Sequence, residues 1–289
     1  MILTDIIPQR IEKSTYHFTV WAPFSGEVTL QSAVDQREIL MSQDQHGYWN
    51  AEMSQVKPGF RYKYRIDKNG ALPDPASCSQ PDGVHGASEL VDLEGYTWND
   101  ESWGGLPLSE MVIYELHVGT FSASHDFAGV ISKLDYLKDL GVNTIEIMPV
   151  AQFSGGRNWG YDGAYPFAVQ STYGGAYGLM DLVNAAHGKG MAVILDVVYN
   201  HLGPEGNYLS NYGPYFSDHY STPWGSPINF DGQYSDQVRN YFIQNALMWC
   251  RDFHIDGLRL DAVHAIYDFS ATHFLKALSD ELNNLGAQN

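Results

Sequence analysis

The first 66 residues carry the pattern of short strands. Runs rich in β-branched and aromatic residues alternate apolar with polar positions, and turn residues such as Pro23 and Gly47 separate the runs. The predicted strands are residues 16–22, 27–32, 48–53 and 60–66. Strands of this length and spacing are typical of a small β-sandwich, so residues 1–105 are predicted to form an all-β domain that ends in a linker.

From residue 106 onward the pattern changes to strands that alternate with helices. Nearly continuous apolar runs predict buried strands, and segments with a period of about 3.6 residues predict helices. The predicted strands are residues 111–118, 143–150, 191–199 and 255–263, and the predicted helices are 126–141, 176–190, 235–253 and 270–285. Four strand–helix units in this order imply a parallel sheet, so residues 106–289 are predicted to be α/β. The pattern alone permits either a barrel or a doubly wound sheet.

Local signals refine these elements. Residues 67–107 are rich in Pro, Gly, Asp and Ser, which is typical of connecting structure, and Trp98 and Trp103 are expected to anchor this segment on the α/β part of the chain. Gly141 is expected to end a helix. Ser235 or Asp236 is expected to cap the start of another helix.

Two connections, residues 151–175 and 200–234, are much longer than usual for α/β units. Both come directly after predicted strands, so both should lie at the carboxyl ends of the sheet, where barrels and open α/β sheets place their sites. Both are rich in Tyr, Trp, Asn and Gly. Long loops of this kind are more often functional than idle, so we expect a binding site there.

Candidate chemistry comes from the predicted strand 255–263. A period of two places Arg259 and Asp261 on one of its faces, while the other face is apolar. A buried charge is costly unless it is paired, and Arg259 could hold Asp261 ionised by lowering its pKa. An oriented, ionised carboxylate can act as a nucleophile. A purely structural ion pair is the alternative interpretation.

The predicted strand 191–199 has a similar feature. Asp196 interrupts its apolar run, and Asn200 and His201 come after its end. Two neighbouring strands therefore use buried positions for polar groups, and both point toward the same end of the sheet. This favours a site over a lone ion pair.

Composition narrows the class of ligand. With 16 Lys and Arg against 34 Asp and Glu, the formal net charge is −18, which argues against binding to nucleic acid or to anionic membranes. Charged residues make up only 17% and aromatic residues 13%. Few charges and many aromatic rings favour a neutral, polar ligand with a flat face, such as a sugar. An aromatic-rich core is the alternative.

Other classes lack support in the sequence. No apolar run approaches the length of a membrane span and no signal peptide is visible, so a cytoplasmic location is expected. Cys78 and Cys250 lie far apart and have no metal-binding spacing. Motifs of nucleotide-binding proteins, zinc proteases and serine hydrolases are absent from the sequence, and neither a metal nor another cofactor is expected.

Two motifs carry a family resemblance. The segments DVVYNH (196–201) and GLRLDAVH (257–264) resemble the first two conserved regions of the α-amylase superfamily of (β/α)8 glycoside hydrolases. The resemblance extends over nearly the whole chain, including an N-terminal domain of the carbohydrate-binding type. It implies that residues 106–289 form about the first half of a (β/α)8 TIM barrel.

The resemblance also implies roles for particular residues. Asp261 matches the catalytic nucleophile and Arg259 the arginine that orients it, so these are the candidate catalytic residues. The implied substrate-binding residues are His201, Tyr161, Asp196, Asn200, His264 and Trp159. Tyr161 would stack under the sugar, with a packed loop aromatic as the alternative. His264 would contact the sugar on the product side, with a structural histidine as an equal alternative. Glu205 and Asp162 are considered only as further sugar ligands.

The two long loops resemble those of the subfamily that releases trehalose from malto-oligosyltrehalose. The implied substrates are therefore malto-oligosyltrehalose and related α-1,4-glucan oligosaccharides. The rings of Tyr208, Tyr212, Tyr215 and Trp224 are expected to contact the trehalose end. A glycogen branching enzyme-like transglycosylase and a non-catalytic carbohydrate-binding protein of the same superfamily remain as alternatives.

A retaining glycosidase also needs a second carboxylic acid about 5–5.5 Å from the nucleophile. In this superfamily it comes after a later strand than the four predicted here, and Glu281 falls within a predicted helix. We therefore expect the 289 residues to be the N-terminal portion of a longer enzyme and to be inactive alone.

Overall fold

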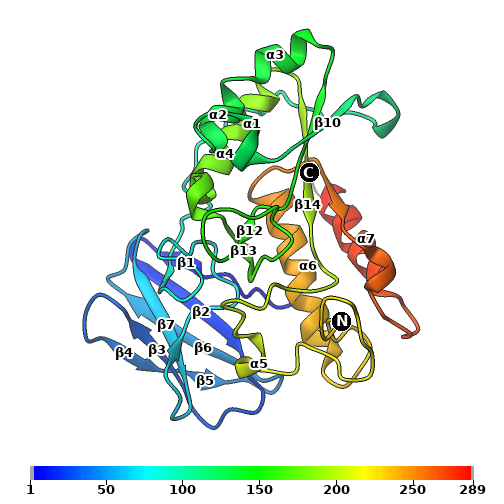
Figure 1. The fold of residues 1–289 in the computed structure, drawn as a ribbon. Helices are drawn as coiled ribbons and strands as arrows, with labels where there is room; N and C mark the ends of the chain where they lie inside the picture. Colours follow the sequence, from blue (N-terminus) through cyan, green and yellow to red (C-terminus); the bar gives the residue numbers. More distant parts are fainter. Residues whose placement is uncertain (1–2, 288–289) are drawn as a thin grey trace.

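The computed structural model describes residues 3–287 and begins with an antiparallel β-sandwich, drawn in blue and cyan in Figure 1. One sheet has the order β1 (Gln9–Glu12), β2 (Thr15–Trp21), β6 (Tyr48–Ser54), β5 (Ser42–Gln43). The other has the order β4 (Glu38–Leu40), β3 (Val28–Ser32), β7 (Arg61–Ile66), β8 (Ala71–Leu72), with β9 (Ser88–Glu89) also paired to β7. All four predicted strands are confirmed. The five other strands are too short to show a period in the sequence.

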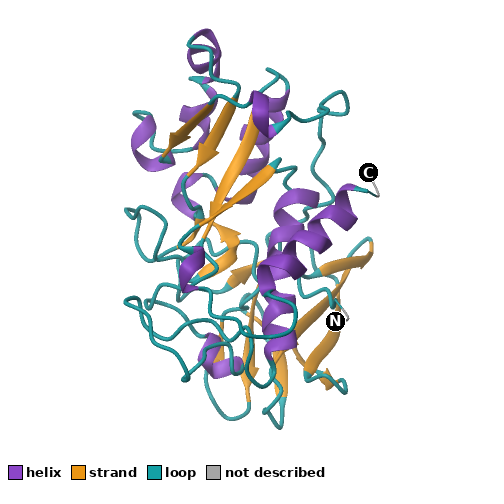
Figure 2. Cartoon of the chain, turned by 90° about the vertical axis from the view of Figure 1, so that its right-hand side faces the viewer, coloured by secondary structure: helices purple, strands orange, loops and turns teal. Residues whose placement is uncertain are grey.

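The second part is built on a parallel sheet of four strands, which lie side by side in Figure 2. Its order is β10 (Ile113–Leu116), β11 (Thr144–Ile147), β14 (Ala192–Val197), β15 (Gly257–Leu260). The order of the strands in space thus matches their order along the chain, as in consecutive strands of a barrel. In a doubly wound sheet, the order of the strands in space reverses partway along the chain. The barrel interpretation is therefore the correct one of the two that the pattern permitted.

Helices connect and cover these strands. The longer ones are α4 (Gly175–His187), α6 (Ser235–Arg251) and α7 (Phe274–Gly286). The short ones are α1 (Val118–Phe121), α2 (Phe127–Ile131), α3 (Leu134–Asp139) and α5 (Leu209–Tyr212), with 3-10 turns η1 (Leu108–Glu110), η2 (Ser171–Tyr173) and η3 (Val263–Ala265). A hairpin of β12 (Ala151–Gln152) and β13 (Tyr165–Val169) lies in the loop after β11. None of the helices within residues 3–287 is long and apolar enough to cross a membrane.

Two local expectations are wrong. The single helix predicted over residues 126–141 is broken into α2 and α3. At the break, the Lys133 N–H donates to Val130 O instead of to Gly129 O, and Gly129 O accepts from the Ser132 hydroxyl (2.7 Å). Helix α6 is capped by neither Ser235 nor Asp236: it begins after Tyr234, whose φ of 66° turns the chain without a side-chain cap. Gly141 lies just after α3 at φ 93°, as expected of a helix stop.

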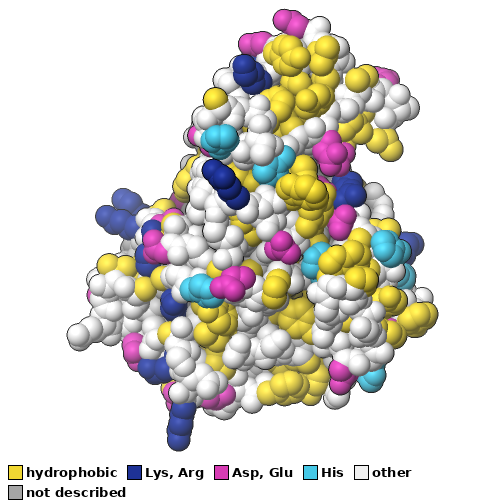
Figure 3. Space-filling view, viewed as in Figure 1, with side chains coloured by type: hydrophobic (Ala, Val, Ile, Leu, Met, Phe, Trp, Pro, Cys, Tyr) yellow, Lys and Arg dark blue, Asp and Glu magenta, His cyan; other side chains and the backbone are white. Residues whose placement is uncertain are grey.

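The parallel sheet has two open edges within the described residues. Strand β10 pairs only with β11, and β15 pairs only with β14. Three of the four residues of β10 are exposed, including Ile113 and Tyr114. In the space-filling view, hydrophobic side chains gather near the top of the molecule, over the region of β10 and α3 (Figure 3). By contrast, every residue of β14 is buried.

The sandwich packs directly on the second part. The Tyr241 hydroxyl of α6 donates to Pro75 O (2.7 Å), and the Tyr212 hydroxyl of α5 donates to Pro73 O (2.7 Å). The Asn240 amide of α6 donates to Thr4 O (2.9 Å). Both tyrosine rings are buried, as is the nearby Tyr215. The expectation that Tyr212 and Tyr215 contact a ligand is therefore wrong, because they fill the junction between the two parts.

The segment between the two parts docks at the amino-terminal ends of the strands. As predicted, Trp98 and Trp103 anchor it: Trp98 stacks on His254 (centroids 3.8 Å apart) and Trp103 on His187 (4.9 Å). His187, at the end of α4, donates from Nδ1 to Asp100 (2.8 Å) and from Nε2 to Asp256 (3.0 Å). Both acceptors are carboxylates, and this geometry favours a ring that carries hydrogen on both nitrogens, the imidazolium form.

The charge balance of this cluster favours the imidazolium. Burial alone would lower the pKa of His187, but the hydrogen bonds that the ring donates to Asp256 and Asp100 outweigh burial and raise that pKa. Asp256 also accepts hydrogen bonds from Trp103 Nε1 (2.7 Å) and from the backbone N–H of Val193 (2.7 Å). We call His187, Asp100, Asp256 and His254 the amino-end cluster.

Candidate active site

One arginine joins two carboxylates at the carboxyl end of the sheet. Strands β14 and β15 pair with Asp196 opposite Arg259. Nη1 of Arg259 donates to Asp196 Oδ2 (2.8 Å) and to Asp261 Oδ1 (2.8 Å). Asp261 lies one residue beyond the end of β15, where its backbone N–H donates to Val197 O (3.0 Å). The predicted contact between Arg259 and Asp261 is thus present, just past the strand rather than within it.

Asp196 is the most buried member of this group. Its side chain is fully buried, and Oδ2 accepts hydrogen bonds from Arg259 and from the Tyr161 hydroxyl (2.9 Å). Oδ1 is buried and has no hydrogen-bond partner among residues 3–287. Burial raises the pKa of Asp196 to about 6, against the opposing effect of the hydrogen bonds from Arg259 and Tyr161. The site thus holds a carboxylate that its surroundings satisfy only in part.

Tyr161 reaches Asp196 because the loop before it passes close to the sheet. Gly160 has φ +98°, and a Cβ at that position would lie 2.0 Å from Pro149 O. Only glycine fits such an approach. Burial and the nearby Asp196 carboxylate raise the pKa of Tyr161, so its hydroxyl stays protonated and donates. Half-buried Tyr161 is thereby held beside Arg259 and Asp261.

Asn200 and His201 complete the group around Asp261. The Asn200 side-chain amide donates to Asp261 O (2.8 Å), and its oxygen accepts from His201 Nδ1. Burial lowers the pKa of His201, which favours a neutral ring. That ring faces the indole of Trp224 (centroids 5.4 Å apart, planes 17° apart), and Trp224 is 48% exposed.

The other predicted residues lie around this group rather than in it. His264 lies in η3 beside Trp224 (centroids 6.4 Å apart), and Trp159 is exposed and lines a neighbouring cavity. Glu205 contacts His85 Nε2 (2.8 Å), and Asp162 accepts from the Asn158 amide (2.7 Å). The structure therefore brings together Asp196, Tyr161, Asn200, His201, Arg259 and Asp261.

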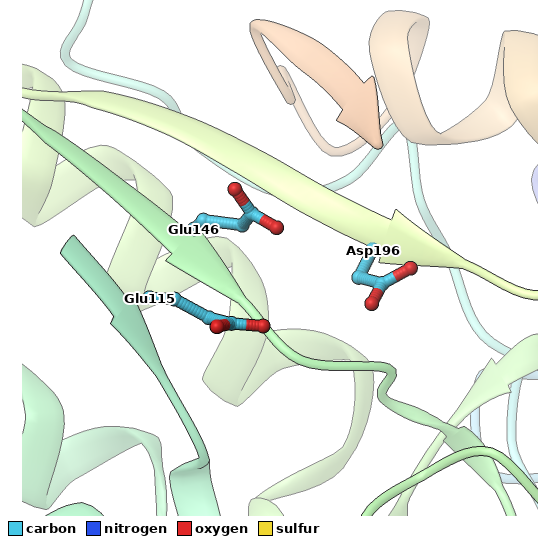
Figure 4. A group of neighbouring side chains, drawn as sticks. All are labelled: Glu115, Glu146 and Asp196. Carbon is cyan, nitrogen blue, oxygen red and sulfur yellow. The ribbon is translucent and has the colours of Figure 1, made fainter. Parts of the chain in front are cut away.

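Two carboxylates of the same sheet were missed. Glu115 of β10 and Glu146 of β11 lie with Asp196, and one oxygen of each lies within 4.8 Å of the other two (Figure 4). Burial and Glu115 raise the pKa of Glu146, while Arg259 opposes them. The sequence did carry a signal, because each glutamate interrupts an apolar strand as Asp196 does. Such oxygens suit a hard cation in principle, and Arg259 already supplies one positive charge beside them.

Comparisons with known proteins bear on the fold of both parts. Residues 94–223 match the family model of the α-amylase catalytic domain, and residues 7–81 match that of carbohydrate-binding module 48, the isoamylase N-terminal domain. The first part of the chain is therefore a sandwich of the carbohydrate-binding module 48 type. The second part is a portion of an α-amylase catalytic domain.

The chain is similar, in particular, to malto-oligosyltrehalose trehalohydrolases. It is 50% identical to the one from Saccharolobus solfataricus over 94% of this chain and 48% of the relative. A 1,4-alpha-glucan branching enzyme from Jannaschia sp. is 30% identical over 90% of this chain and 41% of the relative. A crystal structure of a Salmonella typhimurium protein, provisionally assigned as an alpha amylase, matches with a TM-score of 0.92 at 39% identity, over 98% of this chain and 48% of that one. The chain thus spans about half the length of the curated relatives it matches.

Proposed function

We propose that the whole protein is a retaining glycoside hydrolase acting on malto-oligosyltrehalose, and that this chain, which spans about half the length of its curated relatives, is a portion of it. The whole protein cleaves the α-1,4 bond next to the trehalose end and releases trehalose. The observation that carries this proposal is the Arg259 nitrogen that bridges Asp196 and Asp261 at the carboxyl end of the sheet. The similarity to trehalohydrolases, at 50% identity, supports the substrate.

In the proposed reaction, Asp261 is the nucleophile. Its carboxylate oxygen attacks the anomeric carbon, the bond to the leaving oxygen breaks, and a glycosyl ester forms. Arg259 and Asn200 hold Asp261 in place through its side chain and its backbone carbonyl. A general acid protonates the leaving oxygen, and water then cleaves the ester with overall retention. No residue of 1–289 is assigned as that acid, so we expect these residues alone to show no turnover.

The remaining residues would bind the sugar. His201, whose neutral ring is held through Nδ1 by Asn200, and Tyr161, whose hydroxyl is held by Asp196, would contact the sugar beside Asp261. Trp224, exposed and parallel to His201, offers a flat face for the trehalose end, with His264 next to it. Flat rings and neutral donors suit an uncharged pyranose.

The test compares two substrates side by side. The whole protein is offered malto-oligosyltrehalose and plain amylose, and the products are separated by chromatography. Trehalose from the first with little change in the second is expected. The 30% identity to a branching enzyme makes transglycosylation the second candidate, and new α-1,6 branch points in amylose would decide for it. Binding of both glucans without any product would decide for a non-catalytic protein.

A further inference from the structure

A loop of the sandwich reaches the neighbourhood of the candidate active site. Residues 73–87 leave the sheet after β8 and return to it at β9, and both of these strands pair with β7. Two side chains of β7 hold the loop: Arg61 Nη1 donates to Asp82 (2.6 Å), and Lys63 Nζ donates to His85 O (3.0 Å). The loop is therefore fixed on the sandwich.

The far end of this loop contacts both long connections of the second part. Val84 is buried and packs on Tyr165 of β13, whose hydroxyl donates to Val84 O (2.8 Å). Val84 also lies against Gly206 of the loop after β14. Gly206 has φ +78°, and a Cβ at that position would overlap the Val84 side chain. Only glycine permits so close an approach.

His85, the next residue, contacts two side chains of the loop after β14. Nε2 lies 2.8 Å from a carboxylate oxygen of Glu205, and Nδ1 lies 2.7 Å from the Tyr208 hydroxyl. An ionised carboxylate only accepts, so the geometry favours Nε2 as the donor and Nδ1 as the acceptor from Tyr208. The rings of His85 and Tyr208 also meet edge to face, with centroids 5.9 Å apart. One histidine of the sandwich thus holds this loop at two positions.

The segment that His85 holds starts at His201 of the candidate active site. Two residues further on, Gly203 packs on the loop after β11. Its N–H donates to Gly163 O (2.9 Å), and a Cβ at this position would overlap the backbone of Asp162. The segment is thus fixed at its start by the candidate site and at its far end by the sandwich.

A long connection needs such anchors. Residues 200–234 contain one short helix, α5, and long irregular stretches, which are mobile unless side chains hold them. By contrast, Asp261 is held by Arg259 of β15 and by Asn200 at the start of the connection. Release of the far end of the segment should therefore weaken substrate binding more than it disturbs the nucleophile.

We propose that His85 is a positioning residue for substrate binding. It holds Glu205 and Tyr208, and through them the loop that starts at His201. The sandwich thereby acts on the active site through one side chain, whether or not it binds a glucan itself. The proposal rests on the proposed function for the choice of substrate, but not for the anchoring of the loop.

Kinetics of the whole protein on malto-oligosyltrehalose test the proposal. His85→Ala should raise KM about three- to tenfold, as expected for the net loss of one hydrogen bond, and should change kcat less than about twofold. His85→Gln, which keeps an N–H near the position of Nε2, should recover part of the loss. His46→Ala, at an exposed histidine of the sandwich whose ring contacts Gln45, is the matched control. An unchanged KM in His85→Ala, or an equal rise in His46→Ala, would overturn the proposal.

A second set of variants tests the two partners of His85. In a background of Glu205→Ala and Tyr208→Phe, His85→Ala has no contact left to release, so KM should stay at the value of the background. Side chains that act through one shared contact are non-additive in this way. A further rise of about threefold in that background would show that His85 acts by another route, and would overturn the proposal.

Hydrogen exchange of the whole protein separates this proposal from the proposed function, because it needs no turnover. In His85→Ala the amides of residues 203–211 should exchange faster, including that of Gly203, which is bonded to Gly163 O. Helix α4 is the internal control, and its amides should exchange as in the unaltered protein. Faster exchange of the loop alone supports the anchoring even if the protein releases no trehalose. Unchanged exchange in the loop, or equally faster exchange in α4, would overturn it.

Discussion

The two ends of the parallel sheet hold similar clusters of charged side chains in different surroundings. At each end a cation lies between two carboxylates: His187 between Asp100 and Asp256 at the amino end, and Arg259 between Asp196 and Asp261 at the carboxyl end. The side chain of His187 is 1% exposed, whereas that of Arg259 is 42% exposed. The two clusters thus share their composition but not their surroundings.

The difference lies in how completely the polar atoms are satisfied. In the amino-end cluster, both ring nitrogens of His187 are paired, Asp256 has further donors, and two tryptophans cover the histidines. At the carboxyl end, Asp196 Oδ1 lacks a partner among the described residues and Arg259 faces solvent. A fully paired cluster stabilises a fold, while a partly paired one leaves groups available to a substrate. The comparison predicts that mutations at the two ends have opposite consequences.

The largest expected effect is on turnover. In the whole protein, Asp261→Asn should lower kcat at least about a thousandfold, because the amide keeps the shape and loses the nucleophilic charge. The melting temperature and the affinity for maltoheptaose should change little. Initial-rate assays measure the effect, and Asp218→Asn, at a residue whose side chain is 97% exposed, is the control. A variant that keeps a tenth of the activity would contradict the assignment.

The mirror experiment is His187→Ala at the amino end. It leaves Asp100 and Asp256 buried without their cation, so the free energy of unfolding should fall by about 3–5 kcal/mol. Urea denaturation of the chain measures this loss. The folded fraction should keep an unchanged kcat in the whole protein, because the cluster lies at the far end of the strands. Loss of kcat without loss of stability would contradict a purely stabilising role for the amino-end cluster.

At the carboxyl end, burial of the Asp196 carboxylate should lower the free energy of unfolding at neutral pH. Its folded pKa of about 6 lies above its ordinary value of 3.8, so the stability linked to the protonated form is complete below about pH 4 and is lost as the pH rises through 6. Asp196→Asn should therefore raise the free energy of unfolding at pH 7, by about 1–3 kcal/mol. The same variant should be inactive in the whole protein. A destabilised variant would show that the pairing with Arg259 outweighs burial.

The smallest effect is a pH dependence from the amino end. The pKa of His187 is raised, so its contribution to stability is complete at acidic pH and declines as the pH rises through that raised value. Melting temperatures between about pH 6 and pH 9 should therefore fall more steeply for the unaltered chain than for His187→Ala. Equal slopes of melting temperature against pH in the two proteins would contradict a charged His187 ring.

Much of this arrangement could be predicted from local sequence. The continuous apolar run of β14 and the alternation in β7 showed where strands lie, and the spacing of Arg259 and Asp261 predicted their contact. Contacts between distant segments could not be predicted in this way. Asp100 is 87 residues from His187 and Asp256 is 69, so no period links them.

The loop after β14 shows a second limit. Its aromatic residues were expected to contact a ligand, and composition gave no means of sorting them. Tyr212 and Tyr215 are buried against the sandwich, while Trp224 is exposed beside His201. Which ring packs and which stays open depends on where the sandwich docks, and that is a property of the tertiary structure.

The docked sandwich has a consequence for how a long polymer would be handled. A module on a flexible linker raises the local concentration of whatever it holds, by an amount set by the length of the linker. Here Asn240, Tyr241 and Tyr212 fix the sandwich to the second part. A polymer bound to the sandwich would thus be presented to the second part at one fixed distance and angle. Only chains long enough to span that distance would gain avidity.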